Sequence, residues 1–185
     1  MNQAIQEQPG TKTTERPLYS PGLEGVIAGE SALCQVDEGE AGLRYRGYAI
    51  GDLAKWSRFE EVAYLLLIGH LPTRSELDSF STLLRGHRVL PDPVQRFIDS
   101  LQPGLHPMDV LRTGISLLGL SDPDAQDGSH EANLRKSMRL LSQIPLLIAH
   151  SYRVMSGILP PRQDESRDFA QHLLHLVAGH KDGES

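Results

Sequence analysis

Apolar residues recur at the spacing of an α-helix through most of the chain that follows Trp56. Ser57 and Glu60 predict a capping box, because a serine oxygen and a glutamate carboxylate three residues later satisfy free backbone N–H groups at a helix start. The apolar residues that follow share one face, and glycine and proline end the run: Phe59, Val62, Ala63, Leu66 and Leu67, then Gly69 and Pro72. This pattern predicts a helix with one buried face.

The same signals predict further helices in succession. Thr73 with Glu76 repeats the capping box, and Asp92 with Pro93 marks another helix start. The stripes that we expect to face a core are Leu77, Phe80 and Leu84; Val94, Phe97, Ile98 and Leu101; and Met108, Leu111, Ile115 and Leu118. A longer helical segment over 131–156 contains Pro145, where we expect a bend, and a final helix covers 166–178.

Short apolar pieces separated by glycines precede these helices. "GVIA", "ALCQV" and "GLRY" lie between Gly22 and Tyr48 and predict two or three small strands joined by tight turns. Residues 1–17 lack the basic and apolar regions of a signal peptide, so we expect a disordered lead-in there and a tail over 181–185. The expected fold is therefore all-α over residues 18–180, with a small N-terminal β element.

The charge balance excludes one broad class of function. The 185 residues include 18 basic and 24 acidic side chains, whereas affinity for a phosphate backbone comes mainly from lysine and arginine. We therefore expect no nucleic-acid partner, and we expect the local basic clusters to be solvated helix faces: Arg85, Arg88 and Arg96, and Arg135, Lys136 and Arg139. The longest apolar runs are too short to span a bilayer, so no membrane partner is expected.

The histidines and the single cysteine do not complete a recognisable site. His172 and His175 lie one turn apart without a third ligand nearby in the sequence, and His130 lacks the second histidine of a zinc-binding helix. We interpret the histidines as structural or exposed. Cys34 allows no intrachain disulfide, which fits the reducing cytoplasm, and we interpret it as a buried structural thiol rather than a nucleophile.

The acidic segment "SDPDAQDGS" matches a calcium-binding loop only in part. Asp122 and Asp124 begin the pattern, but the next acid and the glycine come one residue late, and Asn133 stands where the bidentate glutamate belongs. We interpret the segment as a flexible acidic loop. The sequence also lacks a serine-nucleophile elbow, a Walker A loop and a dinucleotide-binding glycine pattern. We therefore assign no catalytic, cofactor-binding or metal-binding residue.

Five segments, in this order and spacing, resemble the amino-terminal half of the citrate synthase and 2-methylcitrate synthase family: "PGLEGVIAGES", "GLRYRGYAIGDLA", "SRFEEVAYLLLIGHLPTRSEL", "LHPMDVLRTGISLLGL" and "PLLIAHSYRVMSGILPP". The resemblance covers about residues 18–179 and implies the helices of that family's large domain, truncated. The family condenses acetyl-CoA or propionyl-CoA with oxaloacetate, using an aspartate and two histidines. Its motifs "HADHE", "PLHGG" and "GxGH" are absent here, so we expect this chain alone to be inactive.

The segment "EAGLRYRGYAI" places Arg44 and Arg46 among tyrosines, which suits either a ligand-binding surface or the corner between a strand and a helix. In the family that this chain resembles, the equivalent segment is a strand that leads into a turn and a helix. We therefore favour the corner, with Gly47 supplying the backbone freedom of the turn. The two arginines are expected to form ion pairs and to stack on neighbours.

The resemblance also implies partners and leaves three hypotheses open. Subunits of the family pair through antiparallel helices, and the stretches 108–118 and 133–155 are either such a dimer interface or an internal core. The chain is then part of a split citrate synthase completed by a carboxy-terminal companion, a non-catalytic protein that modulates a full-length synthase, or an inactive remnant. Acetyl-CoA would be a cosubstrate and not a tightly bound cofactor, and its choice over propionyl-CoA is undecided.

Overall fold

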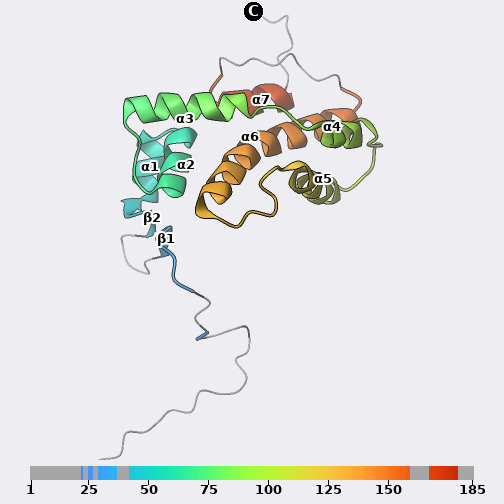
Figure 1. Ribbon diagram of the computed structural model, residues 1–185. Coiled ribbons are helices and arrows are strands. Elements are labelled where there is room, and N and C mark those ends of the chain that lie inside the picture. The colour runs from blue at the N-terminus through green and yellow to red at the C-terminus, as the bar shows by residue number, and fades with distance from the viewer. Residues whose placement is uncertain (1–21, 23–24, 27–28, 37–41, 159–166, 179–185) are drawn as a thin grey trace, which may run out of the picture. The chain divides into compact units, whose positions relative to one another are not determined.

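The computed structural model describes residues 22, 25–26, 29–36, 42–158 and 167–178. The expected lead-in over 1–17 and the tail over 181–185 lie outside these residues, as do residues 27–28 of the expected strand "GVIA". The chain divides into two compact units, residues 1–32 and residues 33–185. The second unit contains the strands and helices that are described below (Figure 1).

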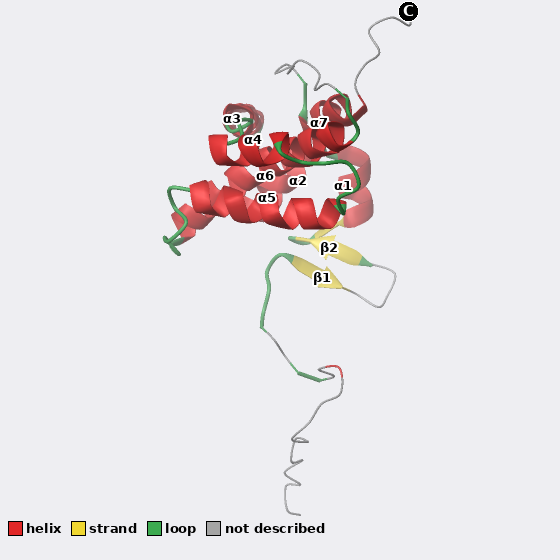
Figure 2. Ribbon diagram, turned by 90° about the vertical axis from the view of Figure 1, so that its right-hand side faces the viewer, coloured by secondary structure: helices red, strands yellow, loops and turns green. Residues whose placement is uncertain are grey.

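Three short strands precede seven helices in the described part of the second unit (Figures 1 and 2). The elements are β1 (Cys34–Val36), β2 (Leu43–Tyr45), β3 (Tyr48–Ala49), α1 (Ile50–Trp56), α2 (Phe59–Ile68), α3 (Arg74–Gly86), α4 (Asp92–Asp99), α5 (Pro107–Ser121), α6 (His130–Met155) and α7 (Phe169–Ala178). The all-α class with a small β element is confirmed. The residue pattern did not predict the short helix α1, which lies where the resemblance implies a helix after the turn.

The three strands form an antiparallel sheet in the order β1-β2-β3. Tyr45 pairs with Tyr48, which leaves Arg46 and Gly47 as a two-residue turn. Both turn residues have positive φ, 49° and 89°, as a type I′ hairpin turn requires. The role predicted for Gly47 is confirmed. The left-handed backbone of Arg46 was not predicted, because asparagine, aspartate and glycine are the usual residues there.

The capping box predicted at Ser57 and Glu60 is wrong by one residue. Helix α2 begins at Phe59, and the Glu61 carboxylate accepts the backbone N–H of Arg58 at 2.7 Å. Ser57 instead follows the last residue of α1. Two adjacent glutamates made the register ambiguous from sequence alone. The shift leaves the Glu60 carboxylate available for a contact outside its own helix.

The second predicted capping box, at the start of α3, is confirmed. The backbone N–H of Glu76 donates to the Thr73 hydroxyl at 3.4 Å, and the Glu76 carboxylate accepts the backbone N–H of Thr73 at 2.8 Å. The backbone N–H and the hydroxyl of Thr73 both donate to the Glu76 carboxylate at 2.8 Å and, with a further bond from His70, lower the pKa of Glu76 to about 2. At the preceding helix end, Gly69 adopts φ 108° at the C-cap of α2, as predicted.

The main core lies among α4, α5 and α6. Its buried members are Val94, Ile98, Leu101, Val110, Leu118 and Leu147. The stripe predicted for α4 is therefore confirmed, whereas the one predicted for α5 is wrong in part. Met108 and Ile115 are 61% and 37% exposed, and Gly114 is buried instead. A Cβ at Gly114 would lie 2.5 Å from Leu147 Cδ1, so glycine permits this close approach of α5 to α6.

The long helix α6 starts at a serine cap and continues through a proline. The Ser129 hydroxyl accepts the backbone N–H of Ala132 at 3.3 Å. Pro145 lies inside the helix, as predicted; the bend expected there stays a prediction. Among the residues that the structure describes, no helix combines the length and the apolar character needed to cross a bilayer.

Candidate functional site

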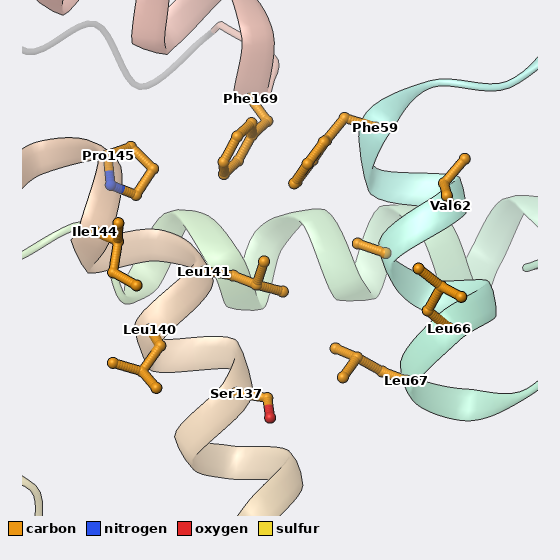
Figure 3. A pocket seen from close by; sticks show the side chains of 11 residues that line it. Phe59, Val62, Leu66, Leu67, Ser137, Leu140, Leu141, Ile144, Pro145 and Phe169 are labelled. Atoms are coloured by element: carbon orange, nitrogen blue, oxygen red, sulfur yellow. The ribbon is translucent and has the colours of Figure 1, made fainter. Parts of the chain in front are cut away.

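An apolar groove of about 500 Å³ lies between α2 and α6, next to the start of α7 (Figure 3). We call it the α2–α6 groove. Figure 3 shows side chains of α2 facing side chains of α6 across it, with Phe169 of α7 near Phe59. The lining residues are Phe59, Val62, Ala63, Leu66, Leu67, Ser137, Leu140, Leu141, Ile144, Pro145 and Phe169.

The α2 wall of this groove is the stripe that the sequence predicts to be buried in a core. Phe59 is 41% exposed, and Val62 and Leu66 are only partly buried. The most buried side chain of α2 is Leu65, which lies off the predicted stripe. The helical periodicity of α2 therefore marks a face that the described residues leave partly uncovered.

Two contacts join α7 to the start of α2 at the edge of the groove. The Glu60 carboxylate, on a residue only 7% exposed, accepts the backbone N–H of Phe169 at 2.7 Å. The rings of Phe59 and Phe169 stack with centroids 3.9 Å apart. Asp168 also caps α7, by accepting the backbone N–H of Gln171 at 2.8 Å. The carboxylates of Glu60 and Asp168 thus satisfy backbone donors in the first turn of α7.

A second apolar groove, of about 390 Å³, lies along α5, α6 and α7, and we call it the α5–α6 groove. Its lining residues are Pro107, Met108, Val110, Leu111, Leu147, Ile148, Ser151, Tyr152, Met155 and Val177. Several large apolar side chains remain exposed here, including Ile148 at 42% and Tyr152 at 47%. Of the stretches expected to form either a dimer interface or a core, Val110 and Leu147 lie in the core, and the dimer interface stays a prediction.

The acidic segment between α5 and α6 is held by arginines. Arg139 donates to both carboxylate oxygens of Asp122, at 2.7 and 2.8 Å, and to Asp124 at 2.6 Å, while Arg135 also binds Asp124. Burial alone would raise the pKa of Asp122, but the hydrogen bonds from Arg139 and from the Asp124 N–H outweigh it and lower that pKa. The hydrogen bonds from Arg135 and Arg139 lower the pKa of Asp124.

Two arginines that we expected on solvated helix faces are largely buried. The side chain of Arg139 is 15% exposed within its ion pairs, and Arg88 is 7% exposed, with Nη1 donating to the Arg167 carbonyl at 3.2 Å. The expectation of solvated faces is therefore wrong at both positions. Sequence spacing could not reveal their partners, because Arg88 and Arg167 are far apart in the chain.

The hairpin arginines contact backbone oxygens. Arg44 Nη1 donates to the Gly47 carbonyl at 3.0 Å, within the turn itself. Arg46 Nη2 donates to the Leu66 carbonyl at 3.2 Å, in the last turn of α2. Among the described residues neither guanidinium lies in an ion pair, although ion pairs were expected. These contacts place both arginines at the corner between strand and helix that the sequence analysis favoured.

Of the histidines considered in the sequence analysis, His172 and His175 lie one turn apart on α7, and His130 is exposed at the start of α6. His70 lies 3.4 Å from Glu76, His106 accepts the Met108 N–H at the start of α5, and His172 is buried. Within the described ranges, no three histidine, cysteine or acidic residues gather as metal ligands would. Cys34 is exposed in β1, so the expectation of a buried thiol is wrong.

Comparison with known proteins identifies the family. A family model described as "Citrate synthase, C-terminal domain" matches residues 22–185. The chain belongs to the citrate synthase family. The 2-methylcitrate synthase of Shewanella oneidensis is 39% identical over 165 residues, which cover 89% of this chain and 43% of that citrate synthase homologue. The 2-methylcitrate synthase 1 of Corynebacterium glutamicum is 40% identical over 166 residues, which cover 88% of this chain and 42% of that protein.

Solved structures of citrate synthases share the fold. The citrate synthase of Thermotoga maritima matches with a TM-score of 0.75 and 32% identity, covering 88% of this chain and 42% of that one. The citrate synthase of Pyrobaculum aerophilum matches with a TM-score of 0.78 and 29% identity, covering 95% and 47%. The chain therefore spans less than half the length of the citrate synthases that it matches.

Proposed function

We propose that this chain is the amino-terminal scaffold of a citrate synthase-type enzyme whose proton-transfer residues lie on a further polypeptide. The observation that carries the proposal is the open α2–α6 groove, because a stripe with core periodicity lines it without being fully covered. The chain matches less than half the length of each of these relatives. The family model is described as a C-terminal domain, whereas the order of the motifs supports the amino-terminal placement.

The reaction of the completed enzyme is the condensation of acetyl-CoA or propionyl-CoA with oxaloacetate. Relatives named as 2-methylcitrate synthases and as citrate synthases both match, so both donors stay candidates. The chemistry needs a base for the thioester α-carbon and donors for the enol and ketone oxygens. In this proposal the present chain supplies none of these groups and acts as the framework that positions them, in the cytoplasm, without a tightly bound cofactor.

A second part of the proposal concerns assembly. We assign the α5–α6 groove and its exposed apolar side chains to pairing with a second subunit, either another copy of this chain or a full-length synthase. The support is the exposure of Met108, Ile148 and Tyr152 on a face whose deeper residues form the main core. Exposed apolar surface of this extent favours association over solvation.

Release of the CoA thiol from acetyl-CoA or propionyl-CoA with oxaloacetate tests the proposed function. We expect no turnover by the chain alone, and turnover when the unmatched carboxy-terminal portion of a relative is co-expressed with it. Turnover by the chain alone would refute the assignment of the catalytic groups to another polypeptide. A change only in the rate of an added full-length synthase would instead identify the chain as a modulator. This is the second candidate function, and the exposed α5–α6 face supports it.

A further inference from the structure

We propose that a polar pocket between α2, α3 and the start of α7 binds inorganic phosphate, as the hydrogen phosphate ion. The pocket has a volume of about 170 Å³, and we call it the arginine pocket. This inference goes beyond the proposed function and does not depend on it. The charged residues that line the pocket are Arg58, Arg74, Arg85, Glu60, Asp78 and Asp168.

The three arginines bring an excess of hydrogen-bond donors to the pocket. Arg58 directly precedes α2, and Arg74 and Arg85 lie at the two ends of α3. Arg74 Nε donates to Asp78 at 3.3 Å, whereas Arg85 Nη2 donates to the Thr82 hydroxyl at 3.1 Å. Most N–H groups of the three guanidinium groups therefore have no acceptor among the described residues. Because guanidinium groups bind oxyanions through paired N–H donors, this excess favours an oxyanion as the ligand.

Two of the three carboxylates in the lining already accept backbone donors of α7. Glu60 accepts the Phe169 N–H at 2.7 Å. Asp168 accepts the Gln171 N–H at 2.8 Å. The third carboxylate, that of Asp78, is bound through Oδ2 by an exposed arginine, and within the described residues its Oδ1 has no donor. The pocket thus offers one open acceptor beside its surplus donors.

This combination distinguishes among oxyanions. Near neutral pH inorganic phosphate keeps at least one proton, so it can accept hydrogen bonds from the arginines and donate its O–H to Asp78. Sulfate carries no proton at that pH. Its oxygens would lie against the carboxylates without a hydrogen bond, and repulsion between like charges opposes such contacts. The lining therefore favours hydrogen phosphate over sulfate.

The volume of the pocket limits the ligand to a small ion. With about 30 Å³ for each molecule of liquid water, the pocket holds about six waters. Pockets for larger organic ligands usually have volumes of about 300–1,000 Å³. An inorganic ion fits this space, whereas a nucleotide or a coenzyme does not.

Isothermal titration calorimetry of the full 185-residue chain with sodium phosphate tests the inference. The ionic strength is held constant with sodium chloride, at about pH 7.5, where a phosphomonoester has lost most of its last proton. Calorimetry is preferable to a thermal shift, because phosphate and sulfate both stabilise folded proteins without binding a specific site.

Arg58→Gln and Arg85→Gln each remove one guanidinium group from the pocket, and the core clusters of the described residues include neither side chain. Arg112→Gln, at a side chain 80% exposed on α5 and outside the pocket, is the matched control. We expect the wild type and the control to bind phosphate equally. The two pocket variants should bind about tenfold more weakly, as the loss of a hydrogen bond to a charged group predicts. Circular dichroism verifies that each variant folds.

Sulfate and phenyl phosphate distinguish free phosphate from other sources of the same chemistry. Both lack the O–H that Asp78 would accept, so the wild type should bind each about tenfold more weakly than inorganic phosphate. Asp78→Asn should remove this preference, because the asparagine amide can donate to an oxyanion that carries no proton.

Three results would overturn the inference. The first is a wild type that releases or absorbs no heat with phosphate beyond dilution. The second is unchanged affinity for phosphate in both Arg58→Gln and Arg85→Gln. The third is sulfate or phenyl phosphate binding as tightly as inorganic phosphate. None of these results bears on the proposed function, because the measured property is binding by this chain alone.

Discussion

The carboxylate of Glu60 accepts the backbone N–H of Phe169 at 2.7 Å, across 109 positions of sequence. This bond connects the first turn of α2 to the first residue of α7. Glu60 is 7% exposed, so its carboxylate contacts the positive end of a helix dipole in a region with little competing water. The stacked rings of Phe59 and Phe169 lie beside it.

Glu60→Ala is expected to lower the free energy of unfolding by about 1–2 kcal/mol, the range found when a capping acceptor is lost. Hydrogen exchange of the α7 amides should accelerate more than that of α4, because the cap acts on α7. Glu60→Gln keeps an oxygen acceptor and should lose less. Chemical denaturation measures the first effect. Equal exchange rates in α7 before and after Glu60→Ala would contradict the capping role.

Gly114→Ala is expected to destabilise the protein by about 1–3 kcal/mol, the usual range for overpacking a core. The added Cβ meets the Leu147 side chain at 2.5 Å, and Leu147 is fully buried. Gly119→Ala in the same helix is the control, because nothing lies within 4 Å of its Cβ position. Thermal unfolding should show opposite signs for the two, since alanine is the better helix former. If both Gly114→Ala and Gly119→Ala stabilised the protein, the close approach of α5 and α6 would be disproved.

Arg139→Met should cost about 2 kcal/mol of stability near pH 7, because it leaves the carboxylate of Asp122 without its two strongest donors. The exposed pair of Arg112 and Asp109, with side chains 80% and 66% exposed, provides a control. Arg112→Met should change stability by less than about 1 kcal/mol. Urea titration of both variants measures the difference. A similar small loss in each would show that the Arg139 network contributes little.

Acid should destabilise the chain through these same carboxylates. The pKa values of Asp122 and Asp124 are lowered in the folded state, so the unfolded chain binds more protons as the pH falls. Their contribution is present in full above the unfolded pKa of about 3.9 and disappears as the pH drops through the folded values. The wild type should therefore lose more free energy of unfolding than Arg139→Met between about pH 5 and about pH 2, a range that spans the pKa of an aspartate in the unfolded chain. Parallel pH profiles would rule this out.

Ile148→Asp should weaken self-association if the α5–α6 face pairs subunits. Ile148 is 42% exposed and lines that groove, so the substitution places a charge in the proposed interface. Leu120→Asp, at a residue 83% exposed and outside the groove, is the control. Light scattering should give twice the chain mass for the wild type and the control, and the chain mass for Ile148→Asp. A monomeric wild type would reject pairing with another copy of this chain and leave a full-length synthase as the proposed partner.

Local patterns predicted most helices, because their signals lie within a few residues. The stripe Val94, Ile98 and Leu101 and the box at Thr73 carry periodicity and capping in one short window, and both are confirmed. The capping box at Ser57 failed because two adjacent glutamates compete for the same role.

The missed features depend on partners distant in sequence. Spacing alone could not show that Glu60 caps α7 or that Arg88 reaches Arg167. Nor could it show which predicted stripe would stay uncovered. The α2 stripe and the α4 stripe share the same periodicity, yet Val94 is fully buried and Phe59 is 41% exposed. Apolar periodicity predicts that a helix face is buried, but it does not predict which segment covers that face.

The turn at Arg46 has a consequence for how the hairpin is retained. Asparagine adopts the left-handed backbone at lower cost, but it lacks the reach to the Leu66 carbonyl that the guanidinium provides. Arg46→Asn would thus relax the bend while releasing the sheet from the end of α2. At this one position, low backbone strain in the hairpin and a hydrogen bond from the hairpin to α2 require different side chains. Arginine provides the hydrogen bond at the cost of the strain.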